Sequence, residues 1–262
     1  MKMKVKTLAC LCALAAIPAF GTEAVTSANT FGVLKVECSA KKVIIATPWI
    51  ECGGSGSVKV TDLVMTANLD QGDTIITYEG GTFKGWILDS DKAWQPLLIS
   101  SSDSTSAYGS VVSSGAAGGE AIARGQAFWF VKNGYTSGSY DLYLYGQDTS
   151  AAATSTVVAG TSGSPAYSLV ASPKTTEADL NTVGTFGFTP NAADEIRVPR
   201  YNLPDLVYTY KATESGWGTS TKQLIEGSNP ARYKKVWTKG CTIPAGTGFW
   251  YVSKGGSGTI TW

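Results

Sequence analysis

Short runs of β-branched, aromatic and other strand-forming residues recur along the chain, and in some of them apolar and polar positions alternate. Residues 74–78 form one such run, residues 79–81 supply a glycine turn, and residues 82–87 form a second run, which together predict a β-hairpin. Residues 140–145 place leucines on one face and tyrosines on the other, as a half-buried strand does. Further strands are predicted at 43–46, 206–210 and 258–262.

Helix signals are sparse by comparison. Thr176 is expected to cap a short helical turn through Leu180 that ends near Gly184, and Thr61 is expected to do the same before Leu63. Glycine contributes 30 residues and charged residues only 16% of the chain, a composition that favours strands and tight turns. Many short strands separated by turns predict an all-β protein built from β-sandwich or barrel-like units.

One motif occurs twice at a fixed spacing. Residues 125–131 (GQAFWFV) match residues 246–252 (GTGFWYV) at an offset of 121 residues. The same offset aligns residues 73–75 (DTI) with residues 194–196 (DEI). Because two separate matches share one offset, the chain is predicted to contain two tandem, diverged repeats.

The repeat divides the chain into segments. We expect a leader at 1–21, a first β-repeat within 22–147, a Ser/Thr/Gly-rich linker or long surface loop at 148–165, and a second β-repeat at 166–262. The two repeats either form separate small β domains or pack face to face as one pseudo-symmetric unit.

The repeated motif also carries a family resemblance. Together with upstream Gly-Trp pairs at 85–86 and 216–217, the Gly-x-x-Phe-Trp-aromatic pattern resembles uncharacterised secreted bacterial β-repeat proteins. In these proteins a unit closes on a segment of the form Pro-x-Gly-x-Gly-Phe-Trp. Residues 244–250 fit that form, whereas the first repeat has Ala123-Arg124 in place of the proline. The resemblance implies export and a β-repeat architecture, and it carries no activity with it.

The first 21 residues are predicted to be a secretory signal peptide. Three lysines precede an apolar run from Leu8 to Phe20, and Ala19 and Gly21 supply the small residues for cleavage. This run is shorter than the roughly 20 apolar residues that span a bilayer, and no later run is long enough. We therefore expect no transmembrane segment and a secreted protein, extracellular or periplasmic.

The charge balance argues against one class of partner. The full chain has 21 basic and 20 acidic residues, and loss of the leader with its three lysines leaves 18 basic against 20 acidic, a net charge of −2. A near-neutral protein has no overall electrostatic attraction for nucleic acid or for an anionic membrane. We expect no nucleic-acid partner.

The chain contains no histidine. This excludes Ser-His-Asp and Cys-His catalysis and removes the commonest zinc ligand. Residues 160–165 (GTSGSP) resemble the nucleophile segment of chymotrypsin-like serine proteases, but a serine without a base is a poor nucleophile. Acidic pairs such as Asp194 with Glu195 leave a carboxylate-based hydrolase as the least favoured reading. We expect no enzyme, no metal and no cofactor.

Three cysteines follow the leader. A disulfide between Cys38 and Cys52 is expected in an oxidising compartment, where it closes a short loop. Cys241 is then either a buried free thiol or an intermolecular link.

Tryptophans are the main candidates for binding. In residues 128–130 and 249–251, strand alternation directs the tryptophan to one face and its aromatic neighbours to the other. One of these faces is core, and the other is either a second buried layer or an exposed platform on which sugar rings stack. The candidate ligand-binding residues are Trp86, Trp129, Trp217, Tyr233, Lys235, Trp237, Lys239 and Trp250.

The last basic segment offers a second kind of surface. If residues 232–239 form a strand, Tyr233, Lys235, Trp237 and Lys239 share one face. Such a face suits an anionic glycan or another acidic polymer. The alternative is a solvated edge strand protected by its lysines.

These observations favour a secreted, non-catalytic module that binds carbohydrate or another extracellular or cell-surface polymer. The alternative is a self-associating structural surface or matrix protein, which the repetition, the Gly/Ser-rich loops and Cys241 would serve.

Overall fold

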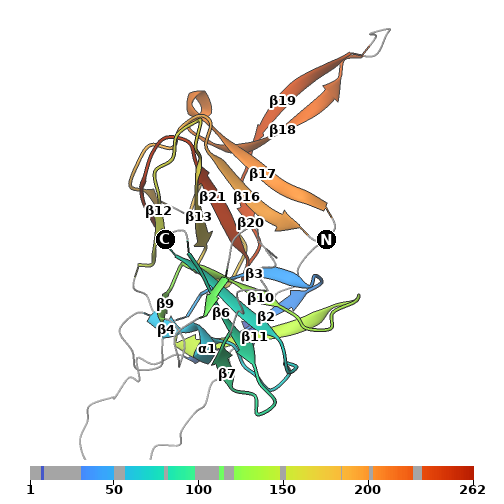
Figure 1. Ribbon diagram of the computed structural model, residues 1–262. Coiled ribbons are helices and arrows are strands. Elements are labelled where there is room, and N and C mark those ends of the chain that lie inside the picture. The colour runs from blue at the N-terminus through green and yellow to red at the C-terminus, as the bar shows by residue number, and fades with distance from the viewer. Residues whose placement is uncertain are drawn as a thin grey trace, which may run out of the picture.

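The computed structural model describes residues 7–8, 31–49, 57–79, 82–97, 112–114, 121–147, 152–183, 185–200, 203–226 and 232–262. Over this part of the chain the fold is all-β, as predicted, with one short α-helix. We call residues 31–147 the first half and residues 152–262 the second half. Figure 1 shows the first half, blue to lime, below the second half, yellow to red.

The elements of the first half are β2 (Phe31–Cys38), β3 (Lys42–Ala46), β4 (Ser57–Lys59), α1 (Val60–Leu63), β5 (Thr74–Glu79), β6 (Thr82–Leu88), β7 (Trp94–Pro96), β8 (Val112–Ser114), β9 (Ala121–Ala123), β10 (Ala127–Val131) and β11 (Tyr140–Gln147). A further short strand, β1 (Thr7–Leu8), lies within the predicted signal peptide and pairs with β2.

The elements of the second half are β12 (Thr154–Val157), β13 (Ala166–Ala171), β14 (Ala178–Asp179), β15 (Thr185–Phe186), β16 (Glu195–Arg200), β17 (Leu203–Lys211), the 3-10 turn η1 (Ala212–Glu214), β18 (Gly216–Leu224), β19 (Tyr233–Lys239), β20 (Thr242–Ile243), β21 (Gly248–Ser253) and β22 (Gly258–Thr261).

The two halves pair their strands in similar orders. The main sheet of the first half runs β3-β10-β5-β6-β7, with β8 beside β6, and that of the second half runs β13-β21-β16-β17-β18-β19. The repeated motif lies on β10 and β21. In the first half, β10 lies between β3 and β5, and in the second half, β21 lies between β13 and β16. The isoleucine of the Asp-x-Ile match belongs to β5 in the first half and to β16 in the second. Small pairs, β4 with β9 and β14 with β20, accompany the main sheets. These matched orders are what two diverged repeats would produce, and the repeat itself stays a prediction.

The predicted hairpin is present. β5 and β6 pair antiparallel with Ile75 opposite Trp86, and both side chains are buried. In β11 the leucines Leu142 and Leu144 are buried while Tyr145 is exposed, so the alternation in the sequence follows the two faces of the strand.

Two local predictions are wrong. The turn expected from Thr176 to Leu180 is instead β14, which pairs with β20. A helix does occur at α1, but its N-cap is Lys59 and not Thr61. At β14, pairing with the distant strand β20 outweighs local helix propensity over so few residues.

Part of the predicted linker is also a strand. β12 pairs with the C-terminal strand β22, and its residues Ser155 and Val157 are buried. Ser and Thr composition predicted a loop here, but a strand of small polar residues is stable when one face packs on a core.

Each half has its own hydrophobic core. The core of the first half includes Phe128 and Phe130 of β10, and that of the second half includes Phe249 and Tyr251 of β21. A third buried cluster draws on both halves and contains Ile44, Ala46, Ile76, Phe83, Ala127, Trp129, Leu169 and Ala171, with Trp250 packed against it. The two halves therefore share a hydrophobic interface.

Reciprocal hydrogen bonds cross this interface. Ala46 N–H donates to the carbonyl of Gly246 at 3.0 Å, and Ala171 N–H donates to the carbonyl of Gly125 at 3.0 Å. Gly125 and Gly246 are the matched glycines of the motif, and Ala46 and Ala171 lie opposite Ala127 and Gly248 in the two sheets. The contacts are thus related by an approximate two-fold operation, as in an isologous interface.

The motif glycines are required at this contact. Gly125 and Gly246 have φ values of 90° and 70°, in the left-handed region that side chains other than glycine rarely adopt. A Cβ on Gly246 would lie 2.7 Å from Val36 of the other half. Backbone conformation therefore requires glycine in both places, and close approach adds a second reason at Gly246.

In each half, one buried aspartate stabilises the turn that precedes a central strand. Asp73 accepts hydrogen bonds from the backbone N–H groups of Asp70 and Asn133 and from Lys132 Nζ. Asp194 accepts from the backbone N–H groups of Asn191 and Lys254 and from the Tyr251 hydroxyl. The backbone donors match at the offset of 121, whereas the third donor is an ammonium in one half and a hydroxyl in the other.

No helix in the described part of the chain is long and apolar enough to cross a membrane.

Candidate functional site

Most of the predicted tryptophan platform is core, which corrects the sequence-based assignment. Trp86 is fully buried, Trp217 is 2% exposed and Trp129 is 7% exposed. Buried indoles cannot stack on a sugar ring, so these three residues are not a binding surface. Trp86 on β6 and Trp217 on β18 also occupy strands at different places in their sheets, so the two Gly-Trp pairs do not correspond.

Trp129 and Trp250 meet each other across the interface. Their ring centroids lie 5.2 Å apart, and Trp250 also contacts Tyr78 and Tyr167. The second face of the motif strand is therefore a buried layer between the halves, one of the two outcomes that strand alternation left open. The sequence left the choice between these outcomes open because alternation does not say what covers each face.

Cys38 does not form the disulfide that the sequence predicts. Cys38 and Cys241 are both free and buried, and the Cys38 thiol lies 3.6 Å from the carbonyl oxygen of Val36. Burial raises the pKa of Cys38 to about 12 and raises that of Cys241 further. Both side chains therefore remain protonated and unreactive at neutral pH. Cys52 lies outside the described residues.

The remaining candidates come together on one hairpin. β18 and β19 pair antiparallel and extend beyond the rest of the second half (Figure 1). Tyr233, Lys235, Trp237 and Lys239 alternate along β19 and so share a face, as predicted for a strand at this segment. Lys222 of β18 joins that face because it lies directly opposite Lys235. We call these five residues, with Lys211 of the neighbouring strand β17, the basic face.

The basic face is the outer side of the sheet. Trp217 comes before Lys222 on β18. Its side chain points to the opposite side of the sheet and packs in the core of the second half. Tyr233 is 62% exposed, while Trp237 is half-buried and lies over Gly218, where a Cβ would be 2.5 Å from its ring. The ammonium of Lys211 lies 5.1 Å from the centroid of the Trp237 ring, a cation–π arrangement.

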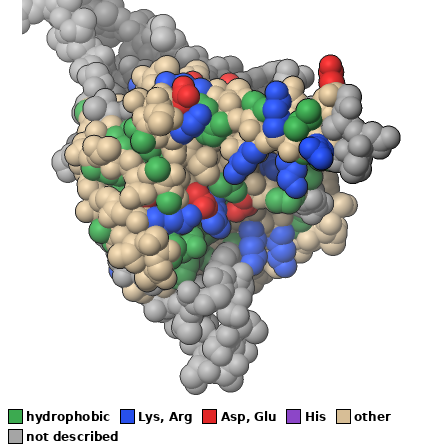
Figure 2. All heavy atoms as spheres, turned by 90° about the horizontal axis from the view of Figure 1, so that it is seen from above, with side chains coloured by type: hydrophobic (Ala, Val, Ile, Leu, Met, Phe, Trp, Pro, Cys, Tyr) green, Lys and Arg blue, Asp and Glu red, His purple; other side chains and the backbone are tan. Residues whose placement is uncertain are grey.

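The lysines are poorly neutralised within the described part of the chain. Lys211 pairs with Glu214 at 3.2 Å, and Lys239 donates to the backbone carbonyl of Glu214. Lys222 and Lys235, by contrast, face each other across the strand pair, and like charges in that position destabilise a sheet. In the view from above, Lys and Arg side chains gather on the side from which the hairpin projects (Figure 2).

Several acidic residues pair with lysine or arginine side chains. The ammonium of Lys132 lies 2.7 Å from Asp70 and 2.8 Å from Asp73, and it occupies the space between their carboxylates. Glu195 binds Arg197 and Lys254; burial disfavours its charge, but these hydrogen bonds prevail and lower its pKa. Within the described ranges, no group of three or more Cys, Asp or Glu side chains is placed to hold a metal ion.

Comparisons of this chain with family models, with curated proteins and with solved structures gave no match.

Proposed function

We propose that this protein is a non-enzymatic binding module that holds an anionic extracellular polysaccharide on the basic face of the β18–β19 hairpin. The observation that carries the proposal is the cross-strand Lys222–Lys235 pair beside the exposed Tyr233. The proposal rests also on the predicted export of the chain, which would place it among such polymers.

Electrostatics favours an anion at this face. Two ammonium groups opposite each other repel, and this repulsion is relieved when carboxylate or sulfate groups lie between them. Because both side chains are exposed, each contact contributes only about 0.2–1 kcal/mol, so useful affinity requires many contacts along a polymer.

An exposed aromatic side chain on the same face favours a sugar over other anions. Tyr233 offers its ring to solvent, whereas the ring of Trp237 is covered by Gly218 on one side and by Lys211 on the other. Aromatic rings pack on the apolar face of a pyranose while neighbouring polar groups bind its substituents.

Binding to polysaccharides tests this proposal. The purified chain is titrated against dextran sulfate, alginate and polygalacturonate, with uncharged dextran as the reference, at low and at 0.3 M salt. We expect binding to the charged polymers only, weakened by salt because exposed charges are screened. The double variant Lys222→Gln/Lys235→Gln should lose about five- to tenfold in affinity, and Tyr233→Ala should also weaken binding.

The control is a charge removed elsewhere. Lys59→Gln changes an exposed lysine on β4, in the first half, and should leave polysaccharide binding unchanged. Equal loss from Lys59→Gln and from the double variant would mean that overall charge, and not this face, governs binding. Equal affinity for duplex DNA and for the polysaccharides would show that the face selects charge without selecting sugar.

One observation favours the alternative of self-association. β1, from the predicted leader, pairs with β2 through Thr7 opposite Leu34 and Leu8 opposite Val33. Removal of residues 1–21 would leave this edge of β2 unpaired, and an unpaired edge is a template for a strand of another copy. Light scattering of the chain beginning at Thr22 tests this: a mass that rises with concentration supports assembly, and a constant monomer mass excludes it.

A further inference from the structure

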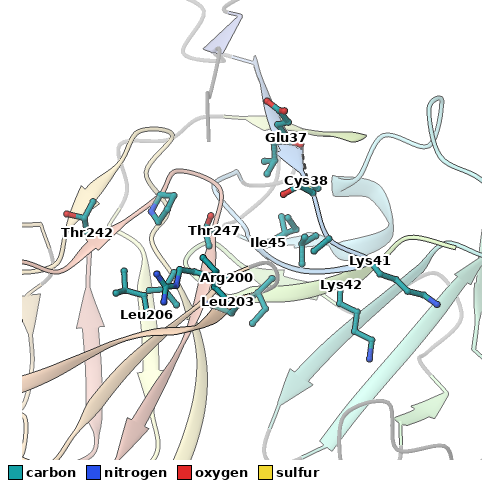
Figure 3. A pocket seen from close by; sticks show the side chains of 18 residues that line it. Glu37, Cys38, Lys41, Lys42, Ile45, Arg200, Leu203, Leu206, Thr242 and Thr247 are labelled. Atoms are coloured by element: carbon teal, nitrogen blue, oxygen red, sulfur yellow. Dashed lines mark hydrogen bonds between the residues drawn. The ribbon is translucent and has the colours of Figure 1, made fainter. Parts of the chain in front are cut away.

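A cavity of about 520 Å³ lies between the two halves, and none of the residues that line it belongs to the basic face. The first half contributes residues 36–45, where β2 turns into β3, and the second half contributes residues 198–200 with Leu203, Leu206 and residues near Thr242. Figure 3 shows Lys41 and Lys42 on one side and Arg200, Leu203 and Leu206 on the other. The volume of the cavity lies within the range of roughly 300–1,000 Å³ that is typical of small-molecule sites.

The walls of the cavity are mostly apolar. Val36, Ile45 and Val198 are buried side chains that also belong to the cores of the two halves. Leu203, at the start of β17, is 58% exposed although it lines the cavity, so a large apolar side chain is left in contact with solvent. A ligand with an apolar body would cover this surface and gain hydrophobic free energy.

The charged side chains around the cavity are mostly cationic. Lys41, Lys42 and Arg200 stand against one carboxylate, that of Glu37. Arg200 Nε donates to the carbonyl of Pro204, and neither Arg200 nor Lys41 forms an ion pair with another described residue. Burial, followed by the charge of Lys41, lowers the pKa of Lys42, so an anion placed there would stabilise its protonated form.

The corresponding space on the other side of the interface is filled. At the offset of 121 residues, Pro199 matches Tyr78. Tyr78 packs on Trp250 with ring centroids 5.3 Å apart and lies against the shared cluster, which contains Leu169. The side chain of Pro199 is shorter than that of a tyrosine. Pro199 lines the cavity together with Ile44. Ile44 corresponds to Leu169, because Ile44 lies opposite Trp129 and Leu169 lies opposite Trp250. The fold can close this kind of space with a tyrosine, and here it is open.

We propose that this cavity binds a small amphiphile with one carboxylate and an apolar tail, such as a medium- or long-chain fatty acid. The tail occupies the space between β3 and β16–β17, in contact with Leu203 and Leu206. The carboxylate lies at the rim, beside the Arg200 guanidinium, on the side of the cavity that Leu203 and Leu206 line. This site is independent of the polysaccharide proposal.

Calorimetric titration of the full chain with dodecanoate, kept below its micelle concentration, tests the site. We expect saturable binding of about one molecule per chain. Dodecanol, which has the tail without the charge, and hexanoate, which has the charge on a short tail, should each bind at least about tenfold more weakly, because each lacks one of the two interactions. Equal binding of dodecanoate and dodecanol would overturn the role of the cations.

Two variants with matched controls locate the site. Leu203→Trp should fill the mouth of the cavity and weaken dodecanoate binding at least about tenfold, whereas Val207→Trp, an exposed position on the same strand that does not line the cavity, should not. Arg200→Gln should weaken dodecanoate binding about tenfold and leave dodecanol binding unchanged. Undiminished dodecanoate binding by Leu203→Trp, with a native circular dichroism spectrum, would overturn the proposal.

The two proposals are separable in the same experiment. Lys222→Gln/Lys235→Gln should lose polysaccharide binding and keep dodecanoate binding, and Leu203→Trp should do the opposite. A variant that loses both would indicate a folding defect, which thermal unfolding of the same sample detects, and the more conservative Leu203→Phe then repeats the test with a smaller ring.

Discussion

At the residue scale, the two matched aspartates show how a buried charge can be structural. Asp73 and Asp194 are both fully buried, and each carboxylate accepts three hydrogen bonds at the turn before a central strand. A buried carboxylate is stable only with such partners, and its removal leaves buried donors without acceptors. The match at one offset was visible in the sequence, but the donors were not.

Replacement of Asp194 should therefore be strongly destabilising. Asp194→Ala leaves the N–H groups of Asn191 and Lys254 and the Tyr251 hydroxyl unpaired, and we expect a loss of about 3 kcal/mol or more in the free energy of unfolding. Urea denaturation measures the change. Asp205→Ala, at an exposed position on β17, is the control and should lie within about 0.5 kcal/mol of the unchanged protein. Similar effects for both variants would contradict the structural role.

At the scale of elements, the β18–β19 hairpin differs from the other strands because it extends beyond the core. Trp217 anchors its base in the second half, and beyond that point the core side continues with Thr219 and Thr221. The outer side carries the lysines and aromatic rings of the basic face. A hairpin without a core beneath it depends on cross-strand pairs, so the repulsive Lys222–Lys235 pair weakens it.

Reversal of one charge in this pair should separate stability from binding. Lys222→Glu places opposite charges across the strands, and we expect the hairpin to gain about 0.2–1 kcal/mol while binding of anionic polysaccharide falls. Hydrogen exchange of the β18 and β19 amides reports the local gain, and the polysaccharide titration reports the loss. A variant that gains stability without losing affinity would show that the pair does not contact the polymer.

At the scale of the whole molecule, the halves are joined by a buried aromatic contact and reciprocal backbone hydrogen bonds. Trp129 and Trp250 pack on each other, and Gly248 allows close approach, since a Cβ there would lie 2.5 Å from Ala127 and from Ile44. An interface of this apolar character should make the halves unfold together.

Loss of the tryptophan contact should uncouple them. Trp129→Ala/Trp250→Ala removes both rings from the interface and should cost about 3–5 kcal/mol or more, since large-to-small changes in a core leave a cavity. Calorimetry should show one transition for the unchanged protein and a broadened or divided transition for the variant. Tyr145→Ala, an exposed aromatic outside the interface, controls for the loss of a ring. A single sharp transition in the double variant would mean that the backbone contacts suffice.

The sequence alone determined the local features of this protein. Strand-forming residues on either side of a glycine turn predicted β5 and β6, and alternation predicted β11, because a half-buried strand exposes every second residue. It also placed Tyr233, Lys235, Trp237 and Lys239 on one face. Short segments such as β14 and β12 were misassigned, because pairing with β20 and β22, far away in the chain, decides their conformation.

Tertiary structure decided what each face of a strand meets. Alternation separates Trp129 from Phe128 and Phe130, but only the packing of the halves shows that Trp129 is buried against Trp250 and cannot bind a sugar. The cavity was likewise out of reach of the sequence, because its walls come from residues 36–45 and from residues near Pro199. Contacts between segments so far apart depend on how the sheets pack, and a pattern read along one strand contains no information about its neighbours in space.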